Sequence, residues 1–319
     1  MKYYFVKLNI KVEELRMSNI IAVIWDFDKT LIDGYMQEPL FEEYNLDSKD
    51  FWSDVNEEIK QLTNEGKKVN KDTYYLNYFI KKAQNGEFPG LNNEKLKSYG
   101  EKLEYYKGIP EIFEKTKHML ESDSKSSYAD FGIKVEHYIV STGFAETIRG
   151  TKLMPFVESI WGCELNEKEI NGEKIINEIL YTIDNTTKTR AIFEINKGIG
   201  KLNNIDVNSK IDDELRRVRF ENMIYIADGP SDIPAFSLIK KNNGNTFAVY
   251  PKGKEKEMKQ AEKMREDGRI DMYAEADYSE QTTAYLWITS KIQEIADKIL
   301  KEEKDKIEKS ASSVPQHII

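Results

Sequence analysis

The chain has 319 residues, and its 47 Lys and Arg against 56 Asp and Glu give a formal net charge of -9. This length exceeds the roughly 100–200 residues of a typical domain and favours two structural units, while the acidic balance argues against nucleic acid or an acidic membrane as a partner. The only cysteine, Cys163, excludes an intramolecular disulfide and a cysteine metal cluster. No apolar run approaches the roughly 18 residues of a membrane span, and charges interrupt residues 1–17 too often for a signal peptide, so we expect a cytoplasmic protein.

Four short apolar runs have the character of buried parallel strands. They are residues 20–25, 137–140, 223–227 and 246–250. Helical patterns separate them, which predicts a three-layer, Rossmann-like α/β core with a mostly parallel sheet. Three of the runs lead directly into a polar residue: Asp26, Ser141 and Asp228. Because ligands of open α/β sheets bind beyond the carboxyl ends of the strands, we expect these three side chains to converge at one site.

The long segment between the first two strands is predicted to be helical. Residues 72–84 and 92–106 have helical spacing, the breaker "NGEFPG" lies between them, and no strand signal interrupts residues 34–107. We therefore expect an inserted helical cap domain at 34–107 and a core domain made of 18–33 and 108–308, with loose termini at 1–17 and 309–319. The helical spacing of the cap aromatics fits a cap core better than substrate contacts. These aromatics are Tyr74, Tyr75, Tyr78 and Phe79.

The second half of the core is predicted to begin with a helix after Ser141, a strand near 159–165 and a hairpin or irregular stretch through 178–184. A helix should follow over 186–198, capped by threonines at its start and by Gly198 at its end. Two further helices are expected at 253–266 and 281–308.

The sequence "DFDKT" after the first strand places Asp26 and Asp28 two residues apart, so both side chains point to the same side. One carboxylate can attack while the other handles protons. Carboxylates at two strand ends can hold Mg²⁺, while a hydroxyl, backbone N–H groups and a lysine neutralise phosphate oxygens. These are the requirements of phosphoryl transfer.

The motifs together resemble the haloacid dehalogenase-like (HAD) superfamily of phosphatases, in its phosphoserine-phosphatase-like branch. The resemblance rests on "DFDKT", "IVSTGF", "TTKTR" and "IADGPSD", which occur in the family's order over roughly residues 20–300. It implies a Mg²⁺-dependent phosphomonoesterase. Asp26 is then the nucleophile that forms an aspartyl-phosphate, and Asp28 is the general acid and later the base.

The resemblance also implies roles for the other motif residues. Ser141, with the N–H groups of Thr142 and Gly143, would bind phosphate, and Lys188 would bridge the nucleophile and the phosphate. The Mg²⁺ ligands implied are Asp26, the carbonyl of Asp28, Asp228 and Asp232. Asp232 would act through water or would instead hold Lys188.

Several assignments have alternatives in the sequence. Thr142 is as close to the strand end as Ser141, and Lys197 and Lys201 lie near Lys188. As ordinary structural residues, Asp28 and Asp232 would be helix caps, and Lys188 would be a surface lysine. Ala227 also stands where the family more often has glycine. We take His118, His137, His317 and Cys163 as structural residues and place Trp25 in the sheet core.

The cap composition bears on the substrate. The phosphoserine-phosphatase branch recognises the amino-acid end of its substrate with cap arginine and acidic residues, but residues 34–107 contain no arginine. We therefore expect a small phosphorylated substrate other than phosphoserine. The cap lysines that can replace arginine electrostatically are Lys60, Lys67, Lys68, Lys71, Lys81 and Lys82. Two other functions fit the same motifs: a phosphotransferase or mutase with the same nucleophile, and a module that binds a phosphorylated ligand without turnover.

Overall fold

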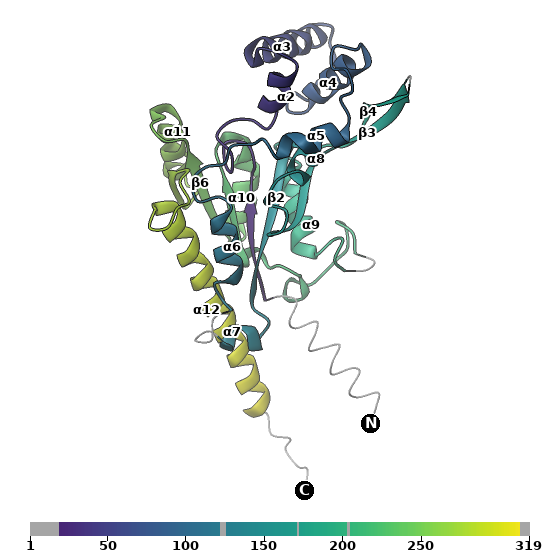
Figure 1. Cartoon of the computed structure of the whole chain (residues 1–319). Helices are drawn as coiled ribbons and strands as arrows, with labels where there is room; N and C mark the ends of the chain where they lie inside the picture. The colour runs from purple at the N-terminus through teal and green to yellow at the C-terminus, as the bar shows by residue number, and fades with distance from the viewer. Residues whose placement is uncertain (1–18, 122–125, 171, 203–204, 313–319) are drawn as a thin grey trace, which may run out of the picture.

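The computed structural model describes residues 19–121, 126–170, 172–202 and 205–312 (Figure 1). The predicted loose termini lie outside these ranges, except that the last helix continues through Ser312. The described residues form a seven-stranded sheet with the order β4-β3-β2-β1-β5-β6-β7. The strands are β1 (Ile20–Trp25), β2 (Lys134–Phe144), β3 (Val157–Ile170), β4 (Glu173–Tyr181), β5 (Met223–Ala227), β6 (Asn245–Tyr250) and β7 (Met272–Glu275). All neighbouring pairs are parallel except β3 and β4, which confirms the predicted α/β class.

Strand β1 lies at the centre of the sheet, and all six of its residues are buried. Its side chains alternate between two cores, because successive strand residues face opposite sides of a sheet. Ile21, Val23 and Trp25 belong to the core that contains side chains of α6 (Glu111–His118) and α12 (Thr283–Ser312). The other core contains side chains of α9 (Lys188–Lys197), α10 (Ile233–Lys241) and α11 (Glu255–Glu266). The sheet is therefore the middle of three layers.

Residues 34–107, which we call the helical segment, contain four helices. They are α2 (Glu38–Glu43), α3 (Ser48–Asn64), α4 (Tyr74–Gln84) and α5 (Asn93–Gly100). Figure 1 shows α2, α3 and α4 at the end of the molecule where β1 leads into them. Phe41, Phe51 and Phe79 pack together inside this segment, with ring centroids 4.7–6.1 Å apart. The helical character agrees with the prediction, while the division into cap and core domains remains a prediction.

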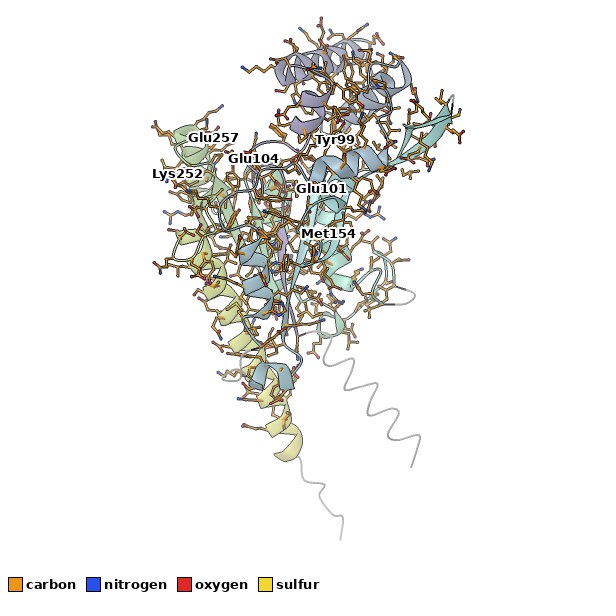
Figure 2. All side chains as sticks on the ribbon, in the orientation of Figure 1. Tyr99, Glu101, Glu104, Met154, Lys252 and Glu257 are labelled. Atoms are coloured by element: carbon orange, nitrogen blue, oxygen red, sulfur yellow. The ribbon has the colours of Figure 1, made fainter. Side chains whose placement is uncertain are left out.

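The two connections between the helical segment and the sheet run side by side. Ile32 and Tyr105 form an antiparallel bridge, and the Tyr106 N–H donates to the Leu31 carbonyl at 3.0 Å. Glu104, labelled in Figure 2, lies on the returning connection between these helices and the sheet. The helical segment is thus attached at the carboxyl end of β1, directly beside Asp26 and Asp28.

Four features of the fold differ from the prediction or extend it. Strand β2 runs through residues 141–143 and leads directly into α8 (Ala145–Arg149). The expected hairpin is present as β3 and β4, which reach beside α4, where Gln84 Nε2 donates to Asn177 Oδ1 at 3.0 Å. Strand β7 was not predicted, and α12 extends four residues beyond the expected end. Within the described ranges, none of the helices combines the length and apolar character that a bilayer span requires.

Candidate active site

The predicted strand-end carboxylates meet at the carboxyl edge of the sheet. Asp26 follows β1 and Asp228 follows the neighbouring strand β5, and the Asp26 N–H donates to the Ile226 carbonyl at 2.9 Å. Carboxylate oxygens of Asp26, Asp228 and Asp232 lie within 4.8 Å of one another. The two acidic motifs, about 200 residues apart in sequence, therefore form one cluster.

Lys188 reaches this cluster from the first residue of α9. Its Nζ lies 2.6 Å from Asp26 Oδ1 and 2.7 Å from Asp232 Oδ1, and the residue is 2 % exposed. The two lysines that the sequence offered as alternatives to Lys188 have other partners. Lys197 donates to main-chain carbonyls, and Lys201 pairs with Glu158. The structure therefore brings together Lys188, and not its neighbours, with the nucleophile candidate.

The start of α9 is held by a residue that we did not predict. Thr187 occupies the N-cap position but makes no side-chain cap hydrogen bond. Instead, the Asp184 carboxylate accepts the N–H groups of Thr186 and Thr187 at 2.9 and 2.6 Å. The threonine cap was thus wrong, because the Thr187 hydroxyl is engaged upstream, where it accepts the Asp184 N–H at 2.7 Å. Gly198 ends the helix in the left-handed conformation, with φ 76°, as predicted.

Asp232 is fully buried, and protein groups occupy both of its oxygens. Oδ1 accepts the Tyr225 hydroxyl at 2.6 Å in addition to Lys188, and Oδ2 accepts the Ser231 hydroxyl at 2.8 Å. Asp232 caps α10 by position but makes no side-chain cap hydrogen bond. Of the two roles that the resemblance implies, these contacts favour the partner that holds Lys188.

Asp28 is held by the segment that leads into the first helix of the helical segment. Its Oδ1 accepts the Met36 N–H at 2.9 Å, whereas α2 begins only at Glu38. Asp28 is therefore not the cap of that helix. Thr30 donates its hydroxyl to Asp26 Oδ2 at 3.2 Å, which fixes the nucleophile candidate from the opposite side to Lys188.

Burial raises the pKa of three carboxyl groups at this site. Burial raises the pKa of Asp28 to about 8, and the nearby Asp26 adds to this effect. Burial also raises the pKa of Asp26, where Lys188 opposes the rise and Asp232 adds to it, and the pKa of Asp228, where Asp26 and Asp232 add to it. Burial alone would lower the pKa of Lys188, but Asp232 and Asp26 outweigh it and raise that pKa, so the lysine stays charged.

The donor set fits a hard divalent cation. Mg²⁺ prefers oxygen ligands, and carboxylates from two strand ends are the groups that bind it in phosphate sites. The repulsion that raises the pKa of Asp228 is the kind that a bound cation relieves. Asp26 and Asp228 would supply these oxygens, because Asp232 is already paired with Lys188.

The predicted phosphate-binding residues lie at the end of β2, next to β1. The Ser141 side chain is buried, and its Oγ accepts the Gly143 N–H at 3.0 Å. The Thr142 carbonyl accepts the Tyr75 hydroxyl at 2.7 Å, so this strand end also contacts the helical segment. Ser141 is the more buried of the two hydroxyl residues, while Thr142 lines the adjoining pocket. Which of them binds phosphate stays a prediction.

A pocket of about 250 Å³ lies between the cluster and the helical segment. The strand ends contribute Asp28 and Thr142, and the helical segment contributes Tyr35, Gln37, Trp52, Lys71, Asp72 and Tyr75. Of the six cap lysines, Lys71 lines this pocket, whereas three others pair with glutamates. Those three are Lys67, Lys81 and Lys82. Sequence reasoning missed Gln37 and Trp52, since neither belongs to a recognisable pattern, and it placed Tyr75 only in the cap core.

The remaining reactive side chains lie outside this site. Cys163 is buried and donates to the Thr142 carbonyl, and burial raises the pKa of its thiol to about 11. His137 is a buried residue of β2 whose ring accepts the Trp25 indole N–H, and His118 pairs with Glu121 on the surface. These contacts agree with the structural roles that we expected. His317 lies outside the described residues.

Comparison with known proteins gave one close curated relative. The chain is 37 % identical over 290 residues to an uncharacterized protein of Borreliella burgdorferi (strain ATCC 35210 / DSM 4680 / CIP 102532 / B31), a match that covers 86 % of this chain and 97 % of the relative. The chain belongs to the same family as this protein. A scan against protein-family models found no matching family.

Solved structures show more distant similarity. A HAD family hydrolase from Salmonella enterica subsp. enterica serovar Typhi is 15 % identical with a TM-score of 0.48, covering 81 % of this chain and 67 % of that chain. A "probable phosphoserine phosphatase" from Vibrio cholerae is 13 % identical with a TM-score of 0.48, covering 90 % and 69 %. Both scores lie below 0.5, so the fold assignment rests on this chain itself. The mostly parallel sheet and the meeting of Asp26, Lys188, Asp228 and Asp232 at its carboxyl edge agree with the α/β core that the resemblance implies.

Proposed function

We propose that this protein is a Mg²⁺-dependent phosphomonoester hydrolase that acts on a small phosphorylated molecule. The observation that carries the proposal is the bridge from Lys188 to Asp26 and Asp232, with Asp228 in the same cluster. These contacts support the assignment of a nucleophile, a cation site and a charged lysine to one place beside a small pocket. The acid Asp28 lines that pocket, where a leaving group would lie.

The reaction follows from these positions in two steps. An Asp26 oxygen attacks the phosphorus, the ester P–O bond breaks, and Asp28 gives its proton to the leaving alcohol oxygen. Asp28 then takes a proton from water, which attacks the phosphorus of the aspartyl-phosphate and releases phosphate, restoring Asp26. The raised pKa of Asp28 suits the acid step, since burial favours the protonated form that can donate to the leaving oxygen.

The other residues would neutralise charge on the phosphate. Lys188 is positioned against Asp26, so it would contact the oxygens of a phosphoryl group on that carboxylate. Ser141 and the N–H groups of Thr142 and Gly143 would hold the remaining oxygens from the neighbouring strand, with the Gly143 N–H exchanging the Ser141 hydroxyl for a phosphate oxygen. Mg²⁺ held by Asp26, Asp228 and the Asp28 carbonyl would supply further charge neutralisation.

The decisive experiment is phosphate release from a panel of small phosphomonoesters, in Mg²⁺ and in a chelator. We expect metal-dependent release that is lost in Asp26→Asn, which folds because Lys188 keeps Asp232 as its partner. Asp213→Asn is a matched control, since the Asp213 side chain is 87 % exposed and lies outside the cluster. Release by Asp26→Asn at the wild-type rate would remove the covalent mechanism.

Two further outcomes would identify the alternative functions. If added alcohols compete with water for the phosphoryl group, the protein is a phosphotransferase with the same nucleophile. If phosphate compounds raise the melting temperature but no metal supports release, the protein is a binding module.

A further inference from the structure

The pocket beside Asp28 contains a polar group that protein partners do not satisfy. Gln37 is 3 % exposed, and its Oε1 is buried without a hydrogen-bond partner among the residues that the structure describes. Buried polar groups in proteins are almost always paired, because an unpaired one loses its hydration without compensation. Because Gln37 lines the pocket, its unpaired carboxamide oxygen is suited to accept a hydrogen bond from a ligand.

The backbone places Gln37 next to the catalytic acid candidate. The N–H of the preceding residue, Met36, donates to Asp28 Oδ1 at 2.9 Å, and Gln37 lines the same pocket as Asp28. Met36 is itself buried and packs on the end of β2, where its sulfur accepts the Phe144 N–H at 3.0 Å. The carboxamide therefore lies on a fixed segment, close to where Asp28 would protonate a leaving oxygen.

The walls of the pocket indicate what kind of alcohol it takes. Trp52 and Tyr75 stand at 60° to each other with ring centroids 5.6 Å apart, and the Tyr75 hydroxyl is already bound to the Thr142 carbonyl. These two rings therefore give the pocket an apolar wall. Beside Asp28, Lys71 and Asp72 add one charge of each sign, which matches an alcohol portion without net charge, whether an uncharged polyol or a zwitterion, and the two aromatic side chains favour the ring of a polyol.

The size of the pocket limits the ligand further. Its volume of about 250 Å³ lies below the usual range for drug-sized ligands, which is roughly 300–1,000 Å³. A single ring fits this volume better than a base joined to a sugar.

We propose that this pocket receives the alcohol portion of a single-ring, uncharged polyol phosphate, and that the Gln37 carboxamide hydrogen bonds one of its hydroxyl groups. This inference rests on the proposed phosphatase activity and adds the substrate class. Gln37 is thereby a specificity-determining residue, while the phosphate itself is bound at Asp26 and Lys188.

The test compares four esters with the full chain in Mg²⁺: a hexose phosphate, phosphoserine, a nucleoside monophosphate, and phenyl phosphate, which has a ring but no hydroxyl group. We expect kcat/KM for the hexose phosphate to exceed that for phosphoserine and for the nucleoside monophosphate by at least about 10-fold. Gln37→Leu should lower kcat/KM for the hexose phosphate by about 10-fold and leave phenyl phosphate within about 3-fold. Gln84→Leu, whose side chain bonds Asn177 outside the pocket, should change neither.

A stability measurement separates ligand binding from a structural role. Replacing an unpaired buried carboxamide by an apolar side chain of similar size should keep or raise the melting temperature of Gln37→Leu. A lower melting temperature together with equal losses on both esters would make Gln37 structural and overturn the inference.

The remaining outcomes are also decisive. Turnover of phenyl phosphate that depends on Asp26, combined with a preference for phosphoserine or the nucleotide, would overturn this inference and leave the hydrolase standing. If the wild type releases phosphate from none of the four esters, the proposed function fails and the inference fails with it.

Discussion

Lys188 and Asp26 are 162 residues apart in sequence, yet the lysine Nζ lies 2.6 Å from the aspartate Oδ1 in a buried pair. Asp232 binds the same amino group at 2.7 Å, so one cation stands between two buried carboxylates. Removing one partner of such a group leaves charges that neither water nor protein compensates. The lysine should therefore matter for folding as well as for turnover.

We expect Lys188→Met to lower kcat by about 100- to 1,000-fold, the usual effect of removing one donor that stabilises developing negative charge. We also expect it to lower the free energy of unfolding by about 3–5 kcal/mol, because Asp26 and Asp232 remain buried without a cation. Phosphate-release kinetics and urea unfolding measure the two effects. Lys201→Met is the control, since Lys201 pairs with Glu158 on the surface and should leave turnover unchanged. If Lys201→Met loses turnover and Lys188→Met does not, the catalytic lysine is Lys201 and not Lys188.

Asp28 should be needed most when the leaving group is a poor one. In Asp28→Asn no carboxylic acid can protonate the leaving oxygen, so alkyl phosphates should lose at least about 100-fold in kcat/KM. Nitrophenyl phosphate has a leaving group that departs without a proton, so its first step should be much less affected. Because Asp28 is also the base for hydrolysis, the phosphorylated protein should then accumulate and can be detected by mass spectrometry. Equal losses on both kinds of ester would contradict the acid role.

Helices α5 and α8 approach each other so closely that only glycine fits at their contact (Figure 1). A Cβ on Gly100 would overlap the Thr147 carbonyl oxygen and the backbone of Gly150. The Thr147 hydroxyl also donates to the Leu96 carbonyl at 3.1 Å, which fixes the distance between the two helices. This contact joins the end of the helical segment to the residues that follow β2.

We expect Gly100→Ala to lower the free energy of unfolding by about 1–3 kcal/mol, because all three atoms that clash with the new Cβ belong to backbone that cannot rotate away. The urea midpoint measures the change. Ser98→Ala on the same helix is exposed and should stay within about 0.5 kcal/mol of the wild type. A Gly100→Ala protein as stable as the control would show that α5 can move away from α8.

The strands of the core could be predicted because their signals are local. The six apolar residues of β1 have no polar interruption, which is typical of a strand buried on both faces, and Asp26 follows immediately. The same holds for β5 and Asp228. The convergence of these two residues then follows from the parallel topology alone.

Other features depend on contacts that no local pattern reports. Strand β7 is short and only partly buried, and it mixes polar with apolar residues because it lies at the edge of the sheet. Gln37 is polar and precedes a helix, so its sequence is that of an ordinary cap, and only the fold reveals that its side chain is buried in a pocket. Thr187 makes no side-chain cap bond to α9 because its hydroxyl pairs with the Asp184 backbone three residues upstream, a contact that a local pattern of threonines does not reveal.

His137 links the stability of the core to pH. Its Nδ1 accepts the Trp25 indole N–H at 3.1 Å, and its Nε2 lies 3.0 Å from the Thr116 hydroxyl, which donates to the Ile112 carbonyl. These partners require a neutral ring with its proton on Nε2. Burial lowers the pKa of His137 from 6.5 to about 3, and Lys117 adds to this effect.

The sign of the pH effect follows from proton binding. Between pH 6.5 and about pH 3 the unfolded chain binds a proton at His137 that the folded chain does not, so this residue makes the free energy of unfolding fall as the pH falls through that window. Above pH 6.5 the residue has no such effect. The loss from about pH 7 to about pH 5 should be about 2 kcal/mol, at about 1.4 kcal/mol per unit below the unfolded pKa.

Urea unfolding of the wild type and of His137→Gln at these two pH values isolates this contribution from the carboxyl groups that titrate in the same range. The variant should be less stable at about pH 7, because the glutamine cannot reproduce both ring contacts, but its further loss at about pH 5 should be smaller by about 2 kcal/mol. His118→Gln on the surface should lose as much as the wild type. If His137→Gln and the wild type lose the same amount, the imidazole is not held neutral by its burial, and Trp25 must then have a different partner in the folded protein.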